Sequence, residues 1–170
     1  PKSLWGGATK KEREEYKRIL SKRKRVNSRS RSWLRNRRDI LEDRFEQVAS
    51  QLRELNEEFE RRGIKINNTN IAEEIMSEKP EDMLKPELQK KIKEFETRQE
   101  LIRRQLPLTQ KSLETLQELV KIERKIGSKQ SVSSINLRMI GQRIAFNSLK
   151  LLKIEFGRRV KEFKTLEKYD

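Results

Sequence analysis

Apolar residues recur along this chain at spacings of three and four, the period of one face of an α-helix. The longest series runs from residue 34 to residue 59 and skips one position, at Arg38. This series, which we name the seam, consists of Leu34, Leu41, Phe45, Val48, Leu52, Leu55 and Phe59. Alternation of the two spacings is the heptad pattern of helices that pack side by side. It predicts a long helix over residues 31–62, ended by Gly63.

The segment before the seam is predicted to be a second, shorter helix. Thr9 and Glu12 have the spacing of a capping box, which favours a helix over residues 10–25. Residues 27–32 alternate Ser or Asn with Arg, and these small polar side chains compete for backbone hydrogen bonds. We therefore expect a break or hinge at 27–32. Residues 1–9 are expected to form a flexible leader.

Several helices are also predicted after the seam. Asn70 with Glu73 has the pattern of a cap for a short helix, and Pro86 is well placed at the start of the next one. Pro107 is expected to start or kink another helix, because proline disturbs a helix interior.

The serine-rich segment 127–134 is the clearest loop between helices in the second half of the chain. A last helix is predicted over residues 135–168. No alternation typical of β-strands stands out. The expected fold class is all-α: an elongated helical bundle of coiled-coil-like hairpins (residues 39–170) with a basic N-terminal arm (residues 1–38).

Composition limits both the core and the chemistry. Of 170 residues, 41% are charged and 32% are hydrophobic, which is too few for a large globular core. The absence of Cys and His excludes disulfides, thiolate metal sites, most zinc sites and Ser-His-Asp catalysis. Six glycines form no phosphate-binding loop. The paired carboxylates occupy positions expected to be solvated, at Glu57-Glu58, Glu73-Glu74 and Glu81-Asp82. We expect no enzymatic activity, no catalytic residue, no metal and no cofactor.

Positive charge is concentrated at the N-terminal end. Between Lys10 and Arg38 there are fourteen Lys or Arg residues and three acids, and the first 38 residues carry +12 of the chain's net +15. Such a concentration suits a protein that neutralises a row of phosphates. A solvated cationic face or a localisation signal is the alternative interpretation. The apolar face of this segment is too thin for insertion into a lipid membrane, so no membrane partner is expected.

The candidate contacts to nucleic acid are Lys17, Arg18, Lys22, Arg23, Lys24, Arg25, Arg29, Arg31, Trp33, Arg35, Arg37 and Arg38. Arginine outnumbers lysine from residue 29 to 38, which favours bidentate contacts to phosphate. Trp33 could stack on an unpaired base or insert into a groove. Alternatively, Trp33 packs against a neighbouring helix.

A second basic stripe lies near the C-terminus. Residues 138–170 hold nine cations and four acids, whereas residues 39–137 carry a net charge of −2. If the last helix folded against the first, the two stripes would join into one surface.

Two short blocks resemble the terminal proteins of protein-primed bacteriophages: Glu15-Tyr16-Lys17-Arg18-Ile19-Leu20 and Phe95-Glu96-Thr97-Arg98-Gln99-Glu100-Leu101. In that family a basic helical N-terminal region binds DNA and a C-terminal helical domain offers a hydroxyl that primes DNA synthesis. The resemblance implies a priming hydroxyl in a loop between helices, for which the candidates are Ser128, Ser131, Ser133 and Ser134. The family's acidic priming loop has no counterpart, because Lys129 stands here. An N-cap and a solvated linker are the alternative roles of these serines.

The function predicted from the sequence is non-enzymatic binding of nucleic acid through the phosphate backbone, largely independent of base sequence. DNA is favoured over RNA, in phage or mobile-element replication or packaging, with a polymerase or larger assembly as a further partner. The expected location is the cytoplasm, or the host cytoplasm or virion interior for a viral protein. The alternative is a structural helical assembly protein, or an RNA- or ribosome-associated protein, that docks through its basic arm. In that case the seam would pair with a second copy or with a larger partner.

Overall fold

The computed structural model describes residues 7, 9–64 and 77–169, and for residues 22–29 it describes the backbone only. Three long helices account for nearly all of this: α1 (Lys10–Arg61), α3 (Lys85–Ile126) and α4 (Lys129–Tyr169). A short 3₁₀ turn, η1 (Pro80–Asp82), precedes α3. No strand occurs in these residues, and the predicted all-α class is confirmed. The predicted cap at Asn70 and Glu73 lies outside the described residues.

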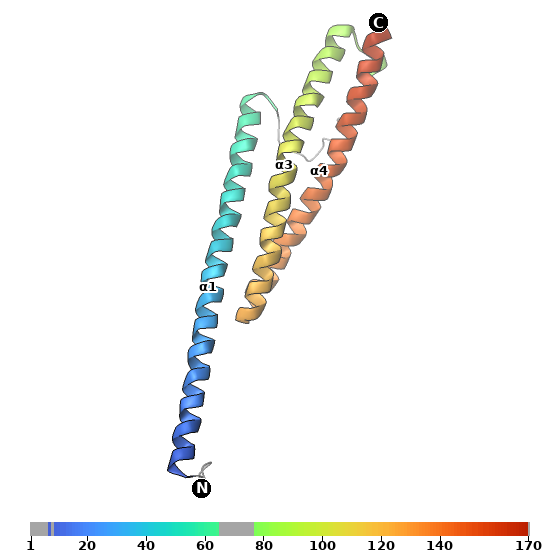
Figure 1. The fold of residues 1–170 in the computed structure, drawn as a ribbon. Coiled ribbons are helices and arrows are strands. Elements are labelled where there is room, and N and C mark those ends of the chain that lie inside the picture. Colours follow the sequence, from blue (N-terminus) through green and yellow to red (C-terminus); the bar gives the residue numbers. More distant parts are fainter. Residues whose placement is uncertain (1–6, 8, 65–76, 170) are drawn as a thin grey trace.

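The helices form an elongated, antiparallel up-down-up arrangement in which α3 lies between α1 and α4 (Figure 1). The N-terminal part of α1 extends well past the ends of α3 and α4 (Figure 1). The start of α1 and the end of α4 lie at opposite ends of the molecule (Figure 1).

Both ends of α1 follow the sequence signals. The Thr9 side chain accepts a hydrogen bond from the Glu12 N–H, and the Glu12 carboxylate accepts one from the Thr9 N–H, each at 3.3 Å. At the other end Gly63 has φ +86°, and its N–H bonds to the Glu60 carbonyl, while the Ile64 N–H bonds to the Phe59 carbonyl. This is a Schellman motif, for which glycine is favoured because its positive φ carries no Cβ clash. The capping box and the terminating glycine are therefore confirmed.

The predicted hinge at residues 27–32 is wrong, because α1 is one continuous helix from Lys10 to Arg61. Helix propagation adds a hydrogen bond per residue without a new nucleus, whereas Ser and Asn cost only roughly 0.5 kcal/mol each relative to Ala. A capping box at one end and a packed seam at the other are enough to carry the helix through this segment.

Two other predicted boundaries also differ from the structure. Pro107 lies inside α3, so of the two alternatives, that it starts a helix or that it kinks one, the first is wrong. Its missing N–H costs one hydrogen bond, but α3 packs against α1 on one side and against α4 on the other. The loop predicted at 127–134 shrinks to Gly127 and Ser128, because α4 begins at Lys129 rather than at residue 135. Serine is favoured in the first turn of a helix as well as in loops, so its abundance did not distinguish the two.

The seam packs against α3 of the same chain. Five of its members are buried, namely Leu34, Leu41, Val48, Leu55 and Phe59, and Phe45 and Leu52 are partly buried. Their neighbours on α3 include Leu101, Leu116 and Leu119. The expectation that the seam pairs with a second chain is therefore corrected: its apolar surface is already covered within one molecule.

A separate cluster joins α3 to α4. Phe95 of α3 lies 5.6 Å from Phe156 and 5.3 Å from Phe163, measured between ring centroids, and all three rings are buried. The C-terminal half of α4 packs on the first half of α3, away from the N-terminal part of α1 (Figure 1). The start of α4 does reach α1, since the Arg138 guanidinium lies 5.0 Å from the centre of the Phe45 ring. The prediction of one joined surface is therefore wrong for the C-terminal half of α4, whereas the first cation of that stripe does lie on α1.

Candidate nucleic-acid interface

The N-terminal part of α1 is a free-standing helix. Among the described side chains of α1, Leu34 is the first that is buried, and every one from Lys10 to Trp33 is exposed. We name residues 10–33 the projecting segment; at 1.5 Å per residue it is about 36 Å long. The first predicted site residues therefore lie on a helix that has no neighbour in the described part of the chain.

The cations of the projecting segment whose side chains are described are almost unpaired. Among its described side chains, only Arg18 lies near a carboxylate, that of Glu15, at 4.0 Å, and both side chains are largely exposed. Lys17, Arg31 and the adjoining Arg35 are likewise exposed. The other predicted contacts, Lys22, Arg23, Lys24, Arg25 and Arg29, lie on the helical backbone of α1, and their side chains are outside the described residues.

Trp33 is 59% exposed, so the interpretation that it packs against a neighbouring helix is wrong. Its ring lies one residue before the first buried position of α1. Tyr16, Ile19 and Leu20 on the same segment are also at least 40% exposed. The projecting segment thus offers aromatic and aliphatic surface among its cations.

Arg37 and Arg38 are not free. Arg37 pairs with Glu118 of α3 at 3.2 Å, and Arg38 Nε lies 3.8 Å from Glu123 Oε1. The Glu123 side chain is only 3% exposed, and its other oxygen has no hydrogen-bond partner among the described residues. Both arginines therefore hold the base of the projecting segment against α3. Both stay candidate phosphate contacts, but each is shared with an acid of α3.

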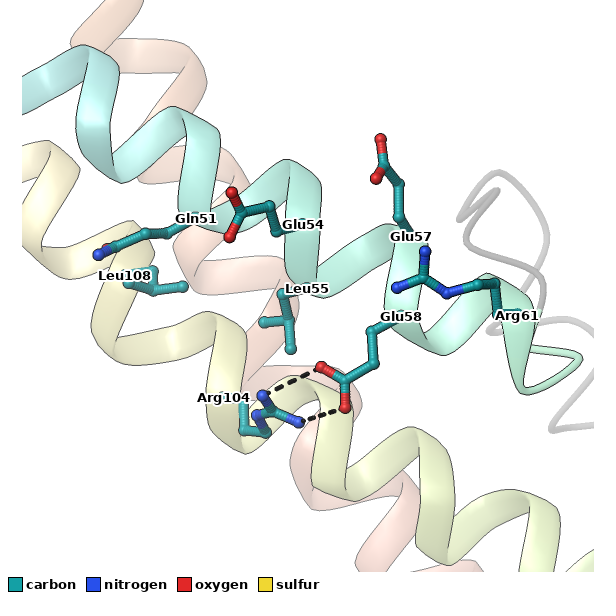
Figure 2. Close-up of a pocket in the computed structure, with 8 residues that line it drawn as sticks. All are labelled: Gln51, Glu54, Leu55, Glu57, Glu58, Arg61, Arg104 and Leu108. Atoms are coloured by element: carbon teal, nitrogen blue, oxygen red, sulfur yellow. Dashed lines mark hydrogen bonds and ion pairs between the residues drawn. The ribbon is translucent and has the colours of Figure 1, made fainter.

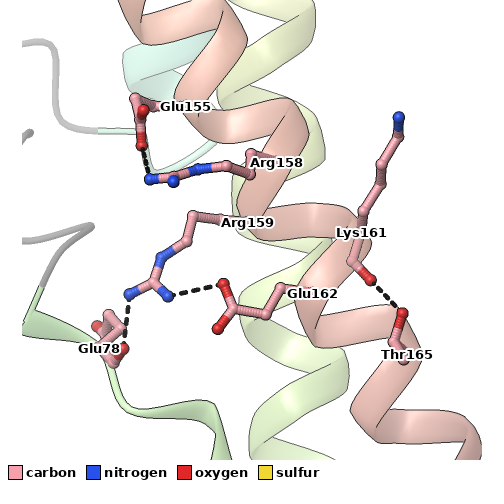
Figure 3. Close-up of polar contacts among 7 residues, drawn as sticks. All are labelled: Glu78, Glu155, Arg158, Arg159, Lys161, Glu162 and Thr165. Atoms are coloured by element: carbon pink, nitrogen blue, oxygen red, sulfur yellow. Dashed lines mark hydrogen bonds and ion pairs between the residues drawn. The ribbon is translucent and has the colours of Figure 1, made fainter.

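Three of the nine C-terminal cations are paired with acids. Arg158 pairs with Glu155 at 2.7 Å, and Lys164 pairs with Glu96 of α3 at 2.7 Å. Arg159 donates to the Glu78 carbonyl at 2.6 Å and to the Glu162 carboxylate at 3.0 Å, whereas the Lys161 side chain points away from this group (Figure 3). These contacts fasten α4 to α3 and to the segment before η1.

The four candidate serines lie at the start of α4. The Ser128 hydroxyl donates to the Ser131 hydroxyl at 2.8 Å and accepts from the Ser131 N–H at 3.3 Å. Ser128 therefore has the role of an N-cap. Ser133 and Ser134 are exposed on the first turns of the helix.

The carboxylate pair Glu57-Glu58 is a packing feature. Glu58 accepts two hydrogen bonds from Arg104 of α3, each 3.2 Å long, which ties α1 to α3 (Figure 2). Glu57 does not join this pair (Figure 2). Among the residues that the structure describes, no three His, Cys, Asp or Glu side chains are grouped so as to hold a metal ion.

Comparisons of this chain with protein-family models, with curated proteins and with solved structures give no match. The resemblance to phage terminal proteins is neither confirmed nor contradicted by them and stays a prediction. Within the described ranges, none of the helices is both long and apolar enough to cross a bilayer.

Proposed function

We propose that this protein binds nucleic acid without acting as an enzyme, and that its projecting segment contacts the phosphate backbone largely independently of base sequence. One observation carries the proposal: a cationic helix leaves the bundle with its described basic side chains exposed and nearly unpaired. Elsewhere the structure places acids beside many of its cations.

Electrostatic repulsion supports a polyanionic partner. Residues 10–33 contain eleven Lys or Arg residues and three Glu residues. Like charges one turn apart on a helix destabilise it by about 0.2–0.5 kcal/mol per pair, and no packing compensates at the described side chains of this segment. A row of phosphates would relieve this repulsion and would release counterions on binding.

The shape of the segment favours duplex DNA over RNA. The major groove of B-DNA is about 12 Å wide and admits an α-helix, whose diameter with side chains is about 10–12 Å. The major groove of duplex RNA is deep and narrow and excludes one. A helix about 36 Å long matches roughly one turn of B-DNA. The proposed setting, replication or packaging of DNA in a phage or mobile element, rests on the sequence resemblance to phage terminal proteins.

The test is the salt dependence of binding to a labelled DNA duplex of mixed sequence. A straight helix presents one side to a duplex, so about half of the eleven cations are expected to engage, which gives a log–log slope of about −5. A scrambled duplex should bind equally well, and duplex RNA of the same length should bind more weakly. A slope near zero would contradict the proposal, and stronger binding to duplex RNA would contradict the choice of DNA.

The narrower proposal of a terminal-protein-like primer rests on the sequence resemblance. The exposure of Ser133 and Ser134 supports these two serines over the capping Ser128. With the cognate polymerase and a labelled nucleotide, label should attach to the wild-type chain and be lost when both serines are replaced by Ala. An active polymerase that leaves the chain unlabelled would remove this proposal and would leave DNA binding unaffected.

A further inference from the structure

Helix α4 carries apolar residues on two opposite faces. One face holds Leu149, Phe156, Val160 and Phe163, which are buried against α3. The other face holds large apolar residues that are each at least 53% exposed: Leu137, Ile140, Ile144, Leu151 and Ile154. Ile140 and Leu149 are nine residues apart, which is about 180° around the axis of an α-helix.

The exposed residues form a regular heptad row. With the exposed Asn147 filling one place, the positions 137, 140, 144, 147, 151 and 154 alternate spacings of three and four. Single exposed apolar residues are ordinary on protein surfaces. A row of five in heptad register, about 26 Å long, is instead the pattern by which one helix packs along another. We name these six residues the outer row.

We propose that the outer row binds a second copy of this chain, as a parallel, in-register pair of α4 helices. Two lines of observation select this occupant: the charges that flank the row, and the polar residue within it. The inference does not depend on nucleic acid, so it can be tested separately from the proposed function.

The flanking charges favour the parallel orientation. Arg143 and Lys150 precede Ile144 and Leu151, whereas Ser148 and Glu155 follow Asn147 and Ile154. In a parallel coiled coil, a residue directly before Ile144 or Leu151 on one helix faces the residue five positions later on the other helix. Lys150 therefore meets Glu155 of the second copy. In an antiparallel pair, the residues directly before Ile144 and Leu151 on one helix face the same positions on the other helix. Arg143 and Lys150 would then lie opposite Arg143 and Lys150 of the second copy. Among the described residues of one chain, Glu155 pairs with Arg158, in an exposed pair of small energetic value.

Asn147 is suited to the same arrangement. A single asparagine in an otherwise apolar row lowers stability, and its amide can both donate to and accept from its counterpart, so an in-register pair satisfies it. In a parallel, in-register pair the two Asn147 side chains meet at the symmetry axis. Any shift by one heptad would bury Asn147 against an apolar residue.

The arrangement has a consequence for the projecting segment. Helix α4 begins at the end of the bundle where α1 extends beyond it (Figure 1). A parallel pair would therefore send two projecting segments in the same direction, as two basic helices that could hold one duplex between them. This consequence, unlike the dimer, rests on the proposed function.

Sedimentation velocity of the full chain in the absence of nucleic acid tests the dimer. At a chain concentration of about 100 µM, where a dimer with micromolar Kd is nearly fully formed, the expected mass is twice the 20.4 kDa of one chain. The double substitution Ile144→Lys and Leu151→Lys should weaken the dimer at least about 100-fold and give a monomer with unchanged helical circular dichroism. Ile19→Lys with Leu84→Lys, at exposed apolar positions outside the row, is the matched control and should remain dimeric.

Disulfide cross-linking tests the orientation, because the chain has no cysteine of its own. Ile140→Cys and Ile154→Cys, made separately, should each link to the same residue of a second copy on oxidation. Lys153→Cys, which is exposed but off the row, should not link. An antiparallel pair centred on Asn147 would link neither variant alone, only their mixture.

A wild-type chain that stays monomeric at this concentration would overturn the proposal, and so would a dimer that survives the double Lys substitution. Binding of lipid vesicles that depends on Ile144 and Leu151, with no dimer, would assign the row to a membrane surface and would also overturn it. Each of these outcomes would leave the salt-dependence test of DNA binding valid, because that test depends on residues 10–33 and not on the outer row.

Discussion

The two basic regions of this protein differ in what surrounds them. Residues 10–33 and the C-terminal helix α4 both carry an excess of Lys and Arg. On α4, Arg158, Arg159 and Lys164 each lie within 3.0 Å of a carboxylate oxygen. On the projecting segment the closest such approach among the described side chains is 4.0 Å. Net charge therefore identifies both regions, and the arrangement of neighbouring acids shows which cations take part in the fold, although Lys153, Lys161 and Lys168 of α4 are also exposed.

The largest expected effect comes from reversing charges in each region in turn. Replacing Lys17, Arg31 and Arg35 by Glu should weaken DNA binding by about 1,000-fold at low salt, because three counterion-releasing contacts become repulsive. The matched control replaces the exposed α4 residues Lys153, Lys161 and Lys168 by Glu, the same change in net charge. This control variant should weaken DNA binding less than about tenfold, since only long-range attraction is reduced. Equal losses in the two variants would show that net charge, not the projecting segment, drives binding.

The two ion pairs at the base of the projecting segment, Arg38 with Glu123 and Arg37 with Glu118, should differ in how much they stabilise the fold. Arg38→Met leaves the buried Glu123 carboxylate without its charge partner and should lower the free energy of unfolding by about 3 kcal/mol. Arg37→Met removes a more exposed pair with Glu118 and should cost less than about 1 kcal/mol. Urea denaturation followed by circular dichroism measures both.

Adding Glu123→Leu to Arg38→Met should restore most of the lost stability, because no unpaired charge is then left in the interface. If the double variant is as unstable as Arg38→Met alone, the loss comes from packing of the arginine stem rather than from the ion pair.

The smallest effect concerns a cation of α3 that is tied to two acids. Partial burial of Lys91 lowers its pKa, but the hydrogen bond to Glu78 at 2.7 Å and the nearby charge of Glu94 outweigh burial, so the pKa is raised above the ordinary 10.5. Because the pKa of Lys91 is raised on folding, the stabilisation that the protonated Lys91 gives with Glu78 and Glu94 is complete below pH 10.5. It is lost as the pH rises through the higher pKa of Lys91 in the folded chain.

The difference in unfolding free energy between the wild type and Lys91→Met should therefore be constant from about pH 7 to pH 9, at roughly 1 kcal/mol or less, and should shrink above pH 10.5. Lys17→Met, on the projecting segment, should show no such difference at any pH. A difference that grows with pH would contradict the sign derived for Lys91.

Local signals in the sequence were sufficient for the helix ends and for the seam. Thr9 with Glu12, and Gly63 after Arg62, act within a few residues, so their outcome depends little on the rest of the chain. The heptad spacing of the seam likewise predicted which face of α1 is buried. Predictions failed where a local preference competed with packing: the Ser and Asn residues at 27–32, Pro107, and the serines after Gly127 are all helical.

The roles of the cations could not be read from the sequence. Arg37 and Arg38 continue the basic run without interruption, yet they pair with acids that follow them by about eighty residues. Likewise, no pattern within α4 distinguishes Leu149, which is buried, from Leu151, which is 66% exposed, because apolar residues lie on both faces of that helix.

The sequence by itself determined the helical class, the positions of the caps, the apolar face of α1 and the place where positive charge accumulates. These properties follow from spacings of a few residues and from composition. Only the tertiary structure decided which helix covers the seam, where α1 leaves the bundle, which cations are neutralised and which face of α4 stays open. Each of these depends on contacts between residues far apart in the chain, because burial and ion pairing are set by the partner that the fold supplies.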